Sequence, residues 1–378
     1  MRIIVAILGI ILIFIMAFDG FETIVLPRRV SRKFRLAPLF YTFSWVLWSF
    51  PARRMRPGNR RESYLGFYGP LSVLLLLAIW ALGFIIGFGL LLWGLSLKVI
   101  APGNDGGLGT YLYFSGTTFI TLGIGDVTPL SGPGRLLTVV ESGVGFAFLA
   151  LIIGYVPIIY QAFSRREGNI ARLDARAGSP PTATAMLQRH YLNKNPDELM
   201  ELLRDWERWC ADLLESHLSY PVLAFYRSQH ERQSWLAALT TILDVCALIL
   251  VGIEGFPKKP AKFTFALARH AAVDLAQVFG ATPTPRDGDR LSSTDFTQLQ
   301  NILSESGIML SDGIAAEKRL AELRAMYEPF VDGLSKRLLL PLPQWIRPPG
   351  AVDDWQTSAW DHFLEATPYT LDRAIQRD

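Results

Sequence analysis

Six consecutive residues of this chain have types and spacing suited to binding a bare cation: Thr121, Leu122, Gly123, Ile124, Gly125 and Asp126. Glycine adopts backbone angles closed to other residues, so two glycines separated by one residue let successive carbonyl groups point toward a common axis. Rings of such carbonyls from four subunits can replace the water shell of a cation. The string therefore predicts a carbonyl-lined cation site, which needs apolar walls if it lies at membrane depth.

Apolar segments on both sides of the string supply such walls. Residues 69–97 are almost continuously apolar, and residues 136–163 form a second long apolar segment, interrupted by Glu141 and a few small residues. Each is long enough to cross a bilayer, which takes about 20 apolar residues. Residues 110–121 are about three helical turns long and dotted with Ser and Thr, which favours a re-entrant helix over a spanning one.

In this order, the elements resemble the two-transmembrane-helix (pore-domain only) potassium channel family of the bacterial type, whose filter usually has the sequence Thr-Val-Gly-Tyr-Gly-Asp. The resemblance covers about a quarter of the chain, residues 69–163. It implies an all-α membrane protein with an outer helix at 69–98, a pore helix at 110–121, a filter at 121–126 and an inner helix at 134–163. It also implies a homotetramer that conducts K⁺ passively, because each chain has a single filter string.

The resemblance assigns roles to individual residues of the filter and the pore helix. The K⁺ sites would be formed by the filter carbonyls, at Thr121, Leu122, Gly123 and Ile124, with Gly125 next in the filter. Asp126 would brace the filter mouth and concentrate cations there, although a turn-forming Asp fits the same place. The pore helix would be supported by Tyr113, Phe114, Thr117 and Glu141.

These supporting roles have plainer alternatives. Tyr113 and Phe114 fall where the family carries an aromatic cuff behind the filter, but packing in an apolar helix explains them equally well. Glu141 is the acid inside the last span, and intramembrane carboxylates are usually functional or paired. We expect it to accept a hydrogen bond from Ser115 or Thr117.

The filter departs from the family pattern at two positions. Ile124 stands where the family usually has Tyr or Phe, and Leu122 where it usually has Val. An isoleucine cannot form the hydrogen bond by which the Tyr hydroxyl ties the filter to the pore helix. A non-selective cation channel on the same scaffold therefore remains an alternative, as does a membrane-anchored helical sensor with a vestigial pore.

The last span contains residues suited to gating. By the resemblance, Gly145 takes the position of a hinge glycine, and Gly143 and Gly154 are alternatives. Pro157 removes a helix hydrogen bond and can kink the helix. The alternative for each glycine is close helix packing, which small residues permit in membranes.

The N-terminal 26 residues predict a further transmembrane helix. Residues 1–18 are apolar, but no small-x-small cleavage site follows them, which argues against a signal peptide. Asp19 and Glu22 would then be solvated charges at its cytoplasmic end.

Segment 27–68 is basic and indicates the orientation of the chain. Its Lys and Arg residues are Arg28, Arg29, Arg32, Lys33, Arg35, Arg53, Arg54, Arg56, Arg60 and Arg61. Such residues mark the cytoplasmic side and attract anionic lipid headgroups. With Arg165 and Arg166 also inside, the filter mouth faces outward in the cell membrane. Residues 36–50 would lie in the inner interface, with Trp45 and Trp48 at headgroup level.

Residues 164–378 predict an α-helical cytoplasmic domain that could bind an unknown ligand. Helical patterns lie at 195–216, 231–253, 261–279, 294–306 and 314–338, and alternating strand patterns are absent. Gly178 to Pro181 suggest a linker. Asp244 at the centre of an apolar stretch favours a buried helix over a further span. Two polar clusters, 217–221 and 226–230, are either pocket linings or, more usually, hydrogen-bond networks.

Composition excludes several other classes of protein. Half of the 378 residues are apolar and 19% are charged, with a net charge of +3 and a mean hydropathy of +0.26. The sequence contains no GxGxxG, P-loop or EF-hand pattern, and its histidines lack metal-ligand spacing. Cys210 and Cys246 are isolated, which fits a reducing compartment. We therefore expect no enzyme activity, no cofactor beyond the transported K⁺ and no nucleic-acid partner.

Overall fold

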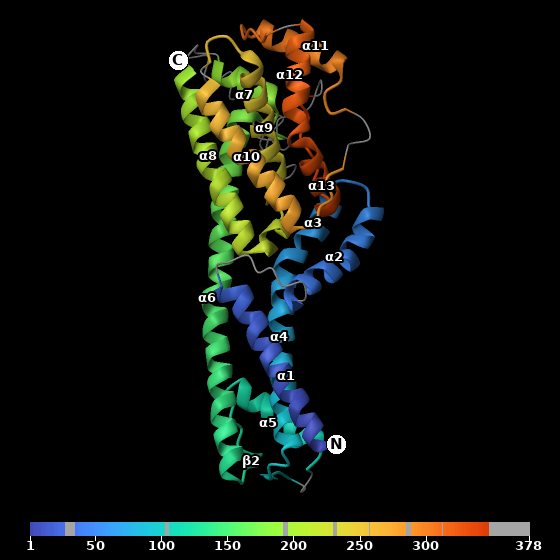
Figure 1. Ribbon diagram of the computed structural model, residues 1–378, viewed down its shortest axis with the longest axis vertical. Coiled ribbons are helices and arrows are strands. Elements are labelled where there is room, and N and C mark those ends of the chain that lie inside the picture. The colour runs from blue at the N-terminus through green and yellow to red at the C-terminus, as the bar shows by residue number, and fades with distance from the viewer. Residues whose placement is uncertain are drawn as a thin grey trace, which may run out of the picture. The chain divides into compact units, whose positions relative to one another are not determined.

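The computed structural model describes residues 1–26, 35–102, 106–191, 196–229, 233–256, 258–284, 289–311 and 313–347 (Figure 1). The chain divides into two compact units, Met1–Gln161 and Ala162–Asp378. Some residues used in the sequence predictions lie outside the described ranges: Arg28, Arg29, Arg32, Lys33, residue 195, residue 230 and the chain beyond Arg347.

Helices account for most of the described residues and the described strands are only two residues long each, which confirms the predicted all-α class. The described sheet consists of β1 (Val99–Ile100) and β2 (Thr128–Pro129). These strands are antiparallel, with Val99 opposite Pro129 and Ile100 opposite Thr128.

Four helical segments of the described chain are long and apolar enough to cross a membrane: Arg2–Val25, Asn59–Gly94, Gly132–Ala177 and Trp235–Gly252. The chain is a membrane protein by this criterion. The fourth segment, however, is buried almost throughout inside the second unit, and it carries the buried Asp244 at its centre. It is therefore a core helix of that unit, as the sequence predicts.

The first helix, α1 (Arg2–Gly20), ends in a π-helical turn (Phe21–Val25) and lies along α4 (Tyr68–Gly94) (Figure 1). Their backbones approach closely at Gly9, where an added Cβ would lie 2.6 Å from the carbonyl oxygen of Gly87. Small residues permit this approach, and dispersion contacts between close backbones drive helix association in lipid.

Between α1 and α4 in the sequence come α2 (Leu36–Arg54) and α3 (Asn59–Gly66). α2 is not among the four described segments that could cross a membrane, although it has 19 residues. Trp45 of α2 packs edge-on against Tyr68 at a ring-centroid distance of 4.9 Å and is 1% exposed. It is therefore buried between helices, and its level in the membrane stays a prediction.

Asp19 and Glu22 are buried, so the prediction of solvated interfacial charges is wrong. Asp19 Oδ1 accepts the backbone N–H of Leu36 at 2.9 Å, and Oδ2 accepts the indole N–H of Trp80 at 2.9 Å. Glu22 forms an ion pair with Arg35 at 3.3 Å. The reason is that an Asp side chain satisfies the free backbone donors at the start of α2, which lies next to it only in the folded unit.

α5 (Leu108–Phe119) and α6 (Gly132–Ala177) complete the membrane elements. α5 packs on α4, and a buried cluster joins this region to the chain after it: Leu92, Tyr111, Phe114 and Val127. Compared with the predicted pore helix at 110–121, α5 begins and ends two residues earlier. Compared with the predicted inner helix at 134–163, α6 is longer at both ends. α6 runs on without a break through Arg165 and Arg166.

The second unit is a helical bundle around α9 (Trp235–Gly252). Its other elements are α7 (Ala183–Tyr191), α8 (Pro196–Ser219), a 3₁₀ helix (Pro221–Phe225), α10 (Lys258–Val278), α11 (Ser293–Glu305), α12 (Gly313–Ala325) and α13 (Glu328–Leu338). α10 packs on both α8 and α9. The single helix predicted at 314–338 is two helices.

The turn at Gly178 to Pro181 is not a linker between domains. It lies within the second unit, and its Ser179 is buried. The carbonyl oxygen of Pro181 accepts a hydrogen bond from the Thr241 hydroxyl of α9 at 3.4 Å. The Gly-Ser-Pro-Pro composition therefore marks a turn between α6 and α7 that packs against the core helix.

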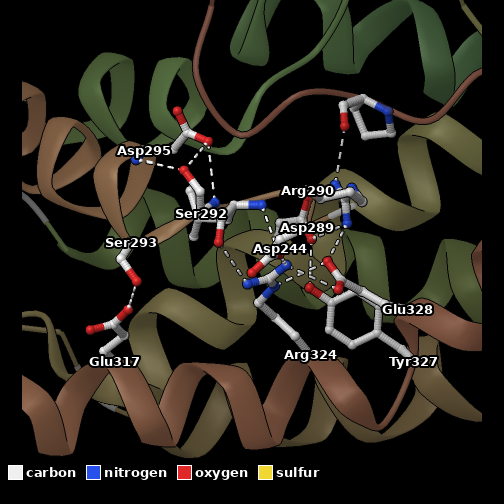
Figure 2. A network of polar contacts seen from close by, with 12 residues as sticks. Asp244, Asp289, Arg290, Ser292, Ser293, Asp295, Glu317, Arg324, Tyr327 and Glu328 are labelled. Carbon is white, nitrogen blue, oxygen red and sulfur yellow. Dashed lines mark hydrogen bonds and ion pairs between the residues drawn. The ribbon is translucent and has the colours of Figure 1, made fainter. Parts of the chain in front are cut away.

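A buried polar network accommodates Asp244 (Figure 2). Two guanidinium N–H groups of Arg290 donate to its carboxylate oxygens at 3.2 and 2.6 Å, and the Tyr327 hydroxyl donates at 2.5 Å. Arg290 also pairs with Glu328 at 3.0 Å, and Arg324 binds the same carboxylate. Because a buried charge is costly unless it is paired, this network explains how an acid occupies the middle of α9.

Candidate functional site

The backbone after α5 alternates in the sign of φ. Thr121, Gly123 and Gly125 have φ values of 60°, 59° and 83°, whereas Leu122 and Ile124 are not in the positive-φ region. Alternation of this kind turns successive peptide planes the same way, which is the arrangement that a carbonyl-lined path requires. A positive φ is unusual for a β-branched residue such as Thr121, and strained backbone of this kind concentrates at functional sites.

The start of this segment is anchored on the last turn of α5. The carbonyl oxygen of Thr117 accepts the backbone N–H of Leu122 at 2.8 Å and that of Gly123 at 3.3 Å. The Thr117 hydroxyl instead donates to the carbonyl oxygen of Phe114 at 3.0 Å. Thr117 thus supports the segment through its backbone, a role that its side-chain type does not reveal.

The end of the segment is tied to α5 by a side chain. The Tyr113 hydroxyl donates to Asp126 Oδ2 at 3.0 Å, and Asp126 Oδ1 accepts the backbone N–H of Val127 at 3.0 Å. Sequence reasoning missed this pair, although it noted that Ile124 lacks a hydroxyl that could tie the segment to α5. In this chain the hydroxyl is on α5 and the acceptor is at the end of the segment.

Phe114 faces away from the segment, into the buried cluster with Leu92, Tyr111 and Val127. The second aromatic support of α5 is Phe119, which stacks on Phe84 at a centroid distance of 5.5 Å. Phe114 is therefore a packing residue, the plainer of its two predicted roles.

Glu141 of α6 lies against Ser115 of α5, the first of its two predicted partners. The Ser115 Oγ contacts Glu141 Oε1 and also lies 2.7 Å from the carbonyl oxygen of Ile85 in α4. Glu141 is fully buried, and its Oε2 has no hydrogen-bond partner among the described residues. A serine hydroxyl has one proton, so it satisfies both contacts fully only if the Glu141 carboxyl carries a proton of its own.

This contact predicts different outcomes for two substitutions of Glu141. Glu141→Gln is expected to keep the free energy of unfolding within about 1 kcal/mol of the original value, because the amide N–H₂ can donate to Ser115. Glu141→Ala is expected to cost about 2 to 3 kcal/mol, because it leaves a cavity and removes the link between α5 and α6. Thermal unfolding of the purified protein in detergent measures both.

The matched control is Glu62→Ala, since the Glu62 side chain is 41% exposed and a change there should have little effect. Equal losses for Glu141→Gln and Glu141→Ala would show that the carboxylate, not a proton donor, is required.

The predicted gating residues differ in their surroundings. A Cβ added at Gly145 would lie 1.9 Å from the carbonyl oxygen of Phe119, whereas one at Gly143 or Gly154 would meet nothing within 4 Å. Gly145 therefore allows α6 to touch the end of α5. α6 continues through Pro157 as one helix, and a hinge at any of these residues stays a prediction.

The described residues contain no cluster of three or more His, Cys, Asp or Glu side chains that could hold a metal ion. The segment after α5 offers a cation its backbone carbonyls, the Thr121 hydroxyl and, at its end, the Asp126 carboxylate. Its flanking helices α4, α5 and α6 supply the apolar surroundings.

Comparison with known families bears on the stretch that contains these residues. Residues 74–162 match the family model described as "Ion channel". This stretch, the ion-channel segment, contains most of α4, all of α5, the alternating backbone and the first two thirds of α6. The match points to a channel role and not to an enzyme.

One curated relative matches over a larger part of the chain. The chain is 25% identical over 208 residues to a Bacillus subtilis (strain 168) protein named "Uncharacterized membrane protein YdjJ". The aligned region is 54% of this chain and 60% of that protein, so the chain spans less than two thirds of this relative. No solved structure matches the chain.

Proposed function

We propose that this chain is the subunit of a homotetrameric, potassium-selective channel that conducts K⁺ passively across the cell membrane. The K⁺ ions would be coordinated by the carbonyl oxygens of the filter residues Thr121, Leu122, Gly123 and Ile124. The single observation that carries the proposal is the alternation of φ at Thr121, Gly123 and Gly125. It lies within the ion-channel segment and directly follows a helix too short to cross a bilayer.

The tetramer follows from the stoichiometry of the filter. Each chain offers one carbonyl strand, and a carbonyl ring that replaces the water shell of K⁺ takes four of them. The exposed apolar face of α6 supports this assembly, because Leu136, Val139, Phe146 and Ile153 are each 66 to 69% exposed in the single chain. Together with lipid, neighbouring subunits would cover these side chains.

Selectivity for K⁺ is supported by the anchoring of the filter at both ends. The Thr117 carbonyl holds its beginning, and the Tyr113–Asp126 hydrogen bond holds its end. These contacts would limit the freedom of the filter where Ile124 has replaced the usual Tyr. An unanchored filter would favour the alternative, a non-selective cation channel.

The orientation of the protein is proposed from its basic residues. Positively charged segments remain on the cytoplasmic side, so the segment that contains Arg53, Arg54, Arg60 and Arg61 would lie inside. The second unit would then be cytoplasmic and the filter mouth would face outward. The same basic residues would bind anionic lipid headgroups.

The test is ion flux through the purified full-length protein in liposomes. We expect K⁺ flux that exceeds Na⁺ flux by at least about tenfold and that Ba²⁺ blocks, because Ba²⁺ matches K⁺ in size but binds carbonyl oxygens more strongly. Equal fluxes of the two ions would support the non-selective alternative. Absence of flux at every pH and voltage would support a sensor protein with a vestigial pore.

A further inference from the structure

One residue from each polar cluster noted in the sequence, His217 and Tyr226, lies next to the guanidinium group of Arg166. Its N–H groups donate to the carbonyl oxygens of Leu223 and Tyr226, each at 2.8 Å. Arg166 is 4% exposed, so it is not the surface charge that its sequence position suggests. The 3₁₀ helix Pro221–Phe225, which connects α8 to α9, is thus held by a residue of α6.

Two further contacts strengthen this junction. The Phe163 ring, about one turn before Arg166 on α6, packs on the Tyr226 ring at a centroid distance of 5.4 Å. Arg166 Nε donates to Glu167 at 2.9 Å, which neutralises the guanidinium charge. Because guanidinium is planar and presents several fixed donors, it holds two carbonyl groups in a defined geometry, as lysine cannot.

His217 of α8 contacts the same guanidinium group as a neutral imidazole that carries its single proton on Nδ1. Its Nδ1 lies 2.8 Å from the carbonyl oxygen of Leu213, which only accepts, so Nδ1 carries the ring proton. Its Nε2, 3.3 Å from Arg166 Nη1, is then an acceptor. A proton on Nε2 would place this N–H donor against the N–H donor of Arg166, and the positive imidazolium against the positive guanidinium, at this distance.

Among the described residues, the groups around His217 disfavour such a proton. Among the described residues that face it, Arg166 is the cation and Glu167 is already paired with Arg166. The Trp235 ring of α9 covers the imidazole at a centroid distance of 5.2 Å, and the Ser216 hydroxyl lies 3.2 Å from Nδ1. Burial, and then the charge of Arg166, hold the pKa of His217 well below its usual value.

We propose that Arg166 is a positioning residue that holds the end of α6, within the second unit, to the α8–α9 connection, and that proton binding at His217 breaks this hold. Arg166 lies only a few residues beyond the ion-channel segment, on the same unbroken helix. Movement of the α8–α9 connection therefore acts directly on α6. This inference rests on the proposed function in one respect, that α6 is the inner helix of a pore.

The direction of the pH effect follows from the lowered pKa. Once the junction opens, the imidazole is solvated and binds a proton below about pH 6.5, whereas the closed junction stays unprotonated. Acid therefore favours the open form. Between about pH 6.5 and the lower pKa of the closed form, each pH unit shifts the equilibrium by up to about tenfold toward opening.

The experiment measures two properties of the purified full-length protein between about pH 7.5 and about pH 5, the range in which histidine titrates. The first is amide hydrogen exchange of residues 220–227, corrected for the intrinsic pH dependence of exchange. The second is K⁺ flux in liposomes as the pH on the side of the second unit is lowered. We expect both to change over the same pH range in the original protein.

The variants separate coupling from folding. His217→Gln keeps an acceptor but cannot be protonated. We expect it to retain protection from exchange at high pH, and its acid-induced increase in exchange rate to be at least about tenfold smaller than in the original protein. Arg166→Met is expected to expose residues 220–227 at every pH. The matched controls are Arg165→Met, on the exposed neighbour, and His190→Gln, on a second histidine that touches an arginine of the same unit.

Each outcome decides the proposal. An unchanged acid response in His217→Gln, or unchanged protection in Arg166→Met, overturns it. The same holds if His190→Gln removes the response as fully as His217→Gln does. If exchange responds as expected but neither the original protein nor any variant conducts ions at any pH, the proposed role of Arg166 and His217 is supported and the channel proposal fails.

Discussion

Gly123→Asp is expected to abolish cation flux while the protein still assembles. Gly123 has a φ of 59°, in the left-handed region that glycine enters most readily, so the variant changes the side chain at a position suited to glycine. In a tetramer the variant would also place four carboxylates beside the conduction path, where they would trap cations or displace the carbonyl groups. Flux in liposomes and the size of the detergent-solubilised protein measure the two properties separately.

The matched control for this variant is Gly132→Asp. Gly132 begins α6, has no atom within 4 Å of an added Cβ and lies outside the filter. An acid at a helix N-terminus is favourable by up to about 1 kcal/mol, so we expect normal assembly and flux. Flux that survives in Gly123→Asp would exclude the filter assignment, because no carbonyl-lined path would tolerate that side chain.

Gly145→Ala is expected to give the second large effect, loss of stability together with loss of flux. The added Cβ would lie 1.9 Å from the carbonyl oxygen of Phe119, so α6 must move away from the end of α5. Overpacking of this kind costs about 1 to 3 kcal/mol, and here the clash is with backbone, which cannot rotate away. The affected carbonyl, that of Phe119, is two residues before Thr121, the first residue of the proposed filter.

Two other glycines of α6 provide controls for Gly145→Ala. Alanine at Gly143 or Gly154 meets no atom within 4 Å in the chain, and alanine in a helix is favoured over glycine by about 0.5 to 1 kcal/mol. The midpoint of thermal unfolding should therefore be clearly lower for Gly145→Ala than for these two variants. Equal stability of all three, with altered gating in Gly145→Ala alone, would favour a hinge at this residue over a packing contact.

The two glycine predictions differ in how much of each came from the sequence. The positive φ of Gly123 could be predicted, because it depends on a local string in which glycine readily adopts such backbone angles. The contact of Gly145 could not, because it depends on how closely α6 approaches α5. Counting along the helix placed Gly145 at a hinge, whereas its surroundings indicate packing.

For the acidic residues, too, part of the environment could be predicted from the sequence and part depended on the tertiary structure. The burial of the helix around Asp244 was predicted, because an acid at the centre of an apolar stretch favours a core helix over a membrane span. The identity of its partners, Arg290 and Tyr327, was not, because they lie more than 40 residues away in the sequence. Asp19 was predicted to be solvated, and its burial against α2 and Trp80 depends on a helix start that is adjacent only after folding.

Arginines were the residues most poorly interpreted from sequence. A basic pair after an apolar span, Arg165 and Arg166, indicates the cytoplasmic side of a membrane helix. One of the two is exposed and the other is buried among carbonyl groups, since adjacent positions on a helix face different directions. No local pattern distinguishes a topological charge from a buried anchor, because the carbonyl partners come from the chain between α8 and α9.

The sequence by itself determined the helical class, the apolar segments, the position of the string whose φ alternates and the burial of α9, because these depend on composition, periodicity and local backbone preference. Only the tertiary structure decided the Tyr113–Asp126 bond, the link from Glu141 to Ser115 and the hold of Arg166 on the α8–α9 connection. Each of these joins residues from different elements. Hydrogen-bond partners across elements are fixed by packing distance and direction, which no single segment of the sequence encodes.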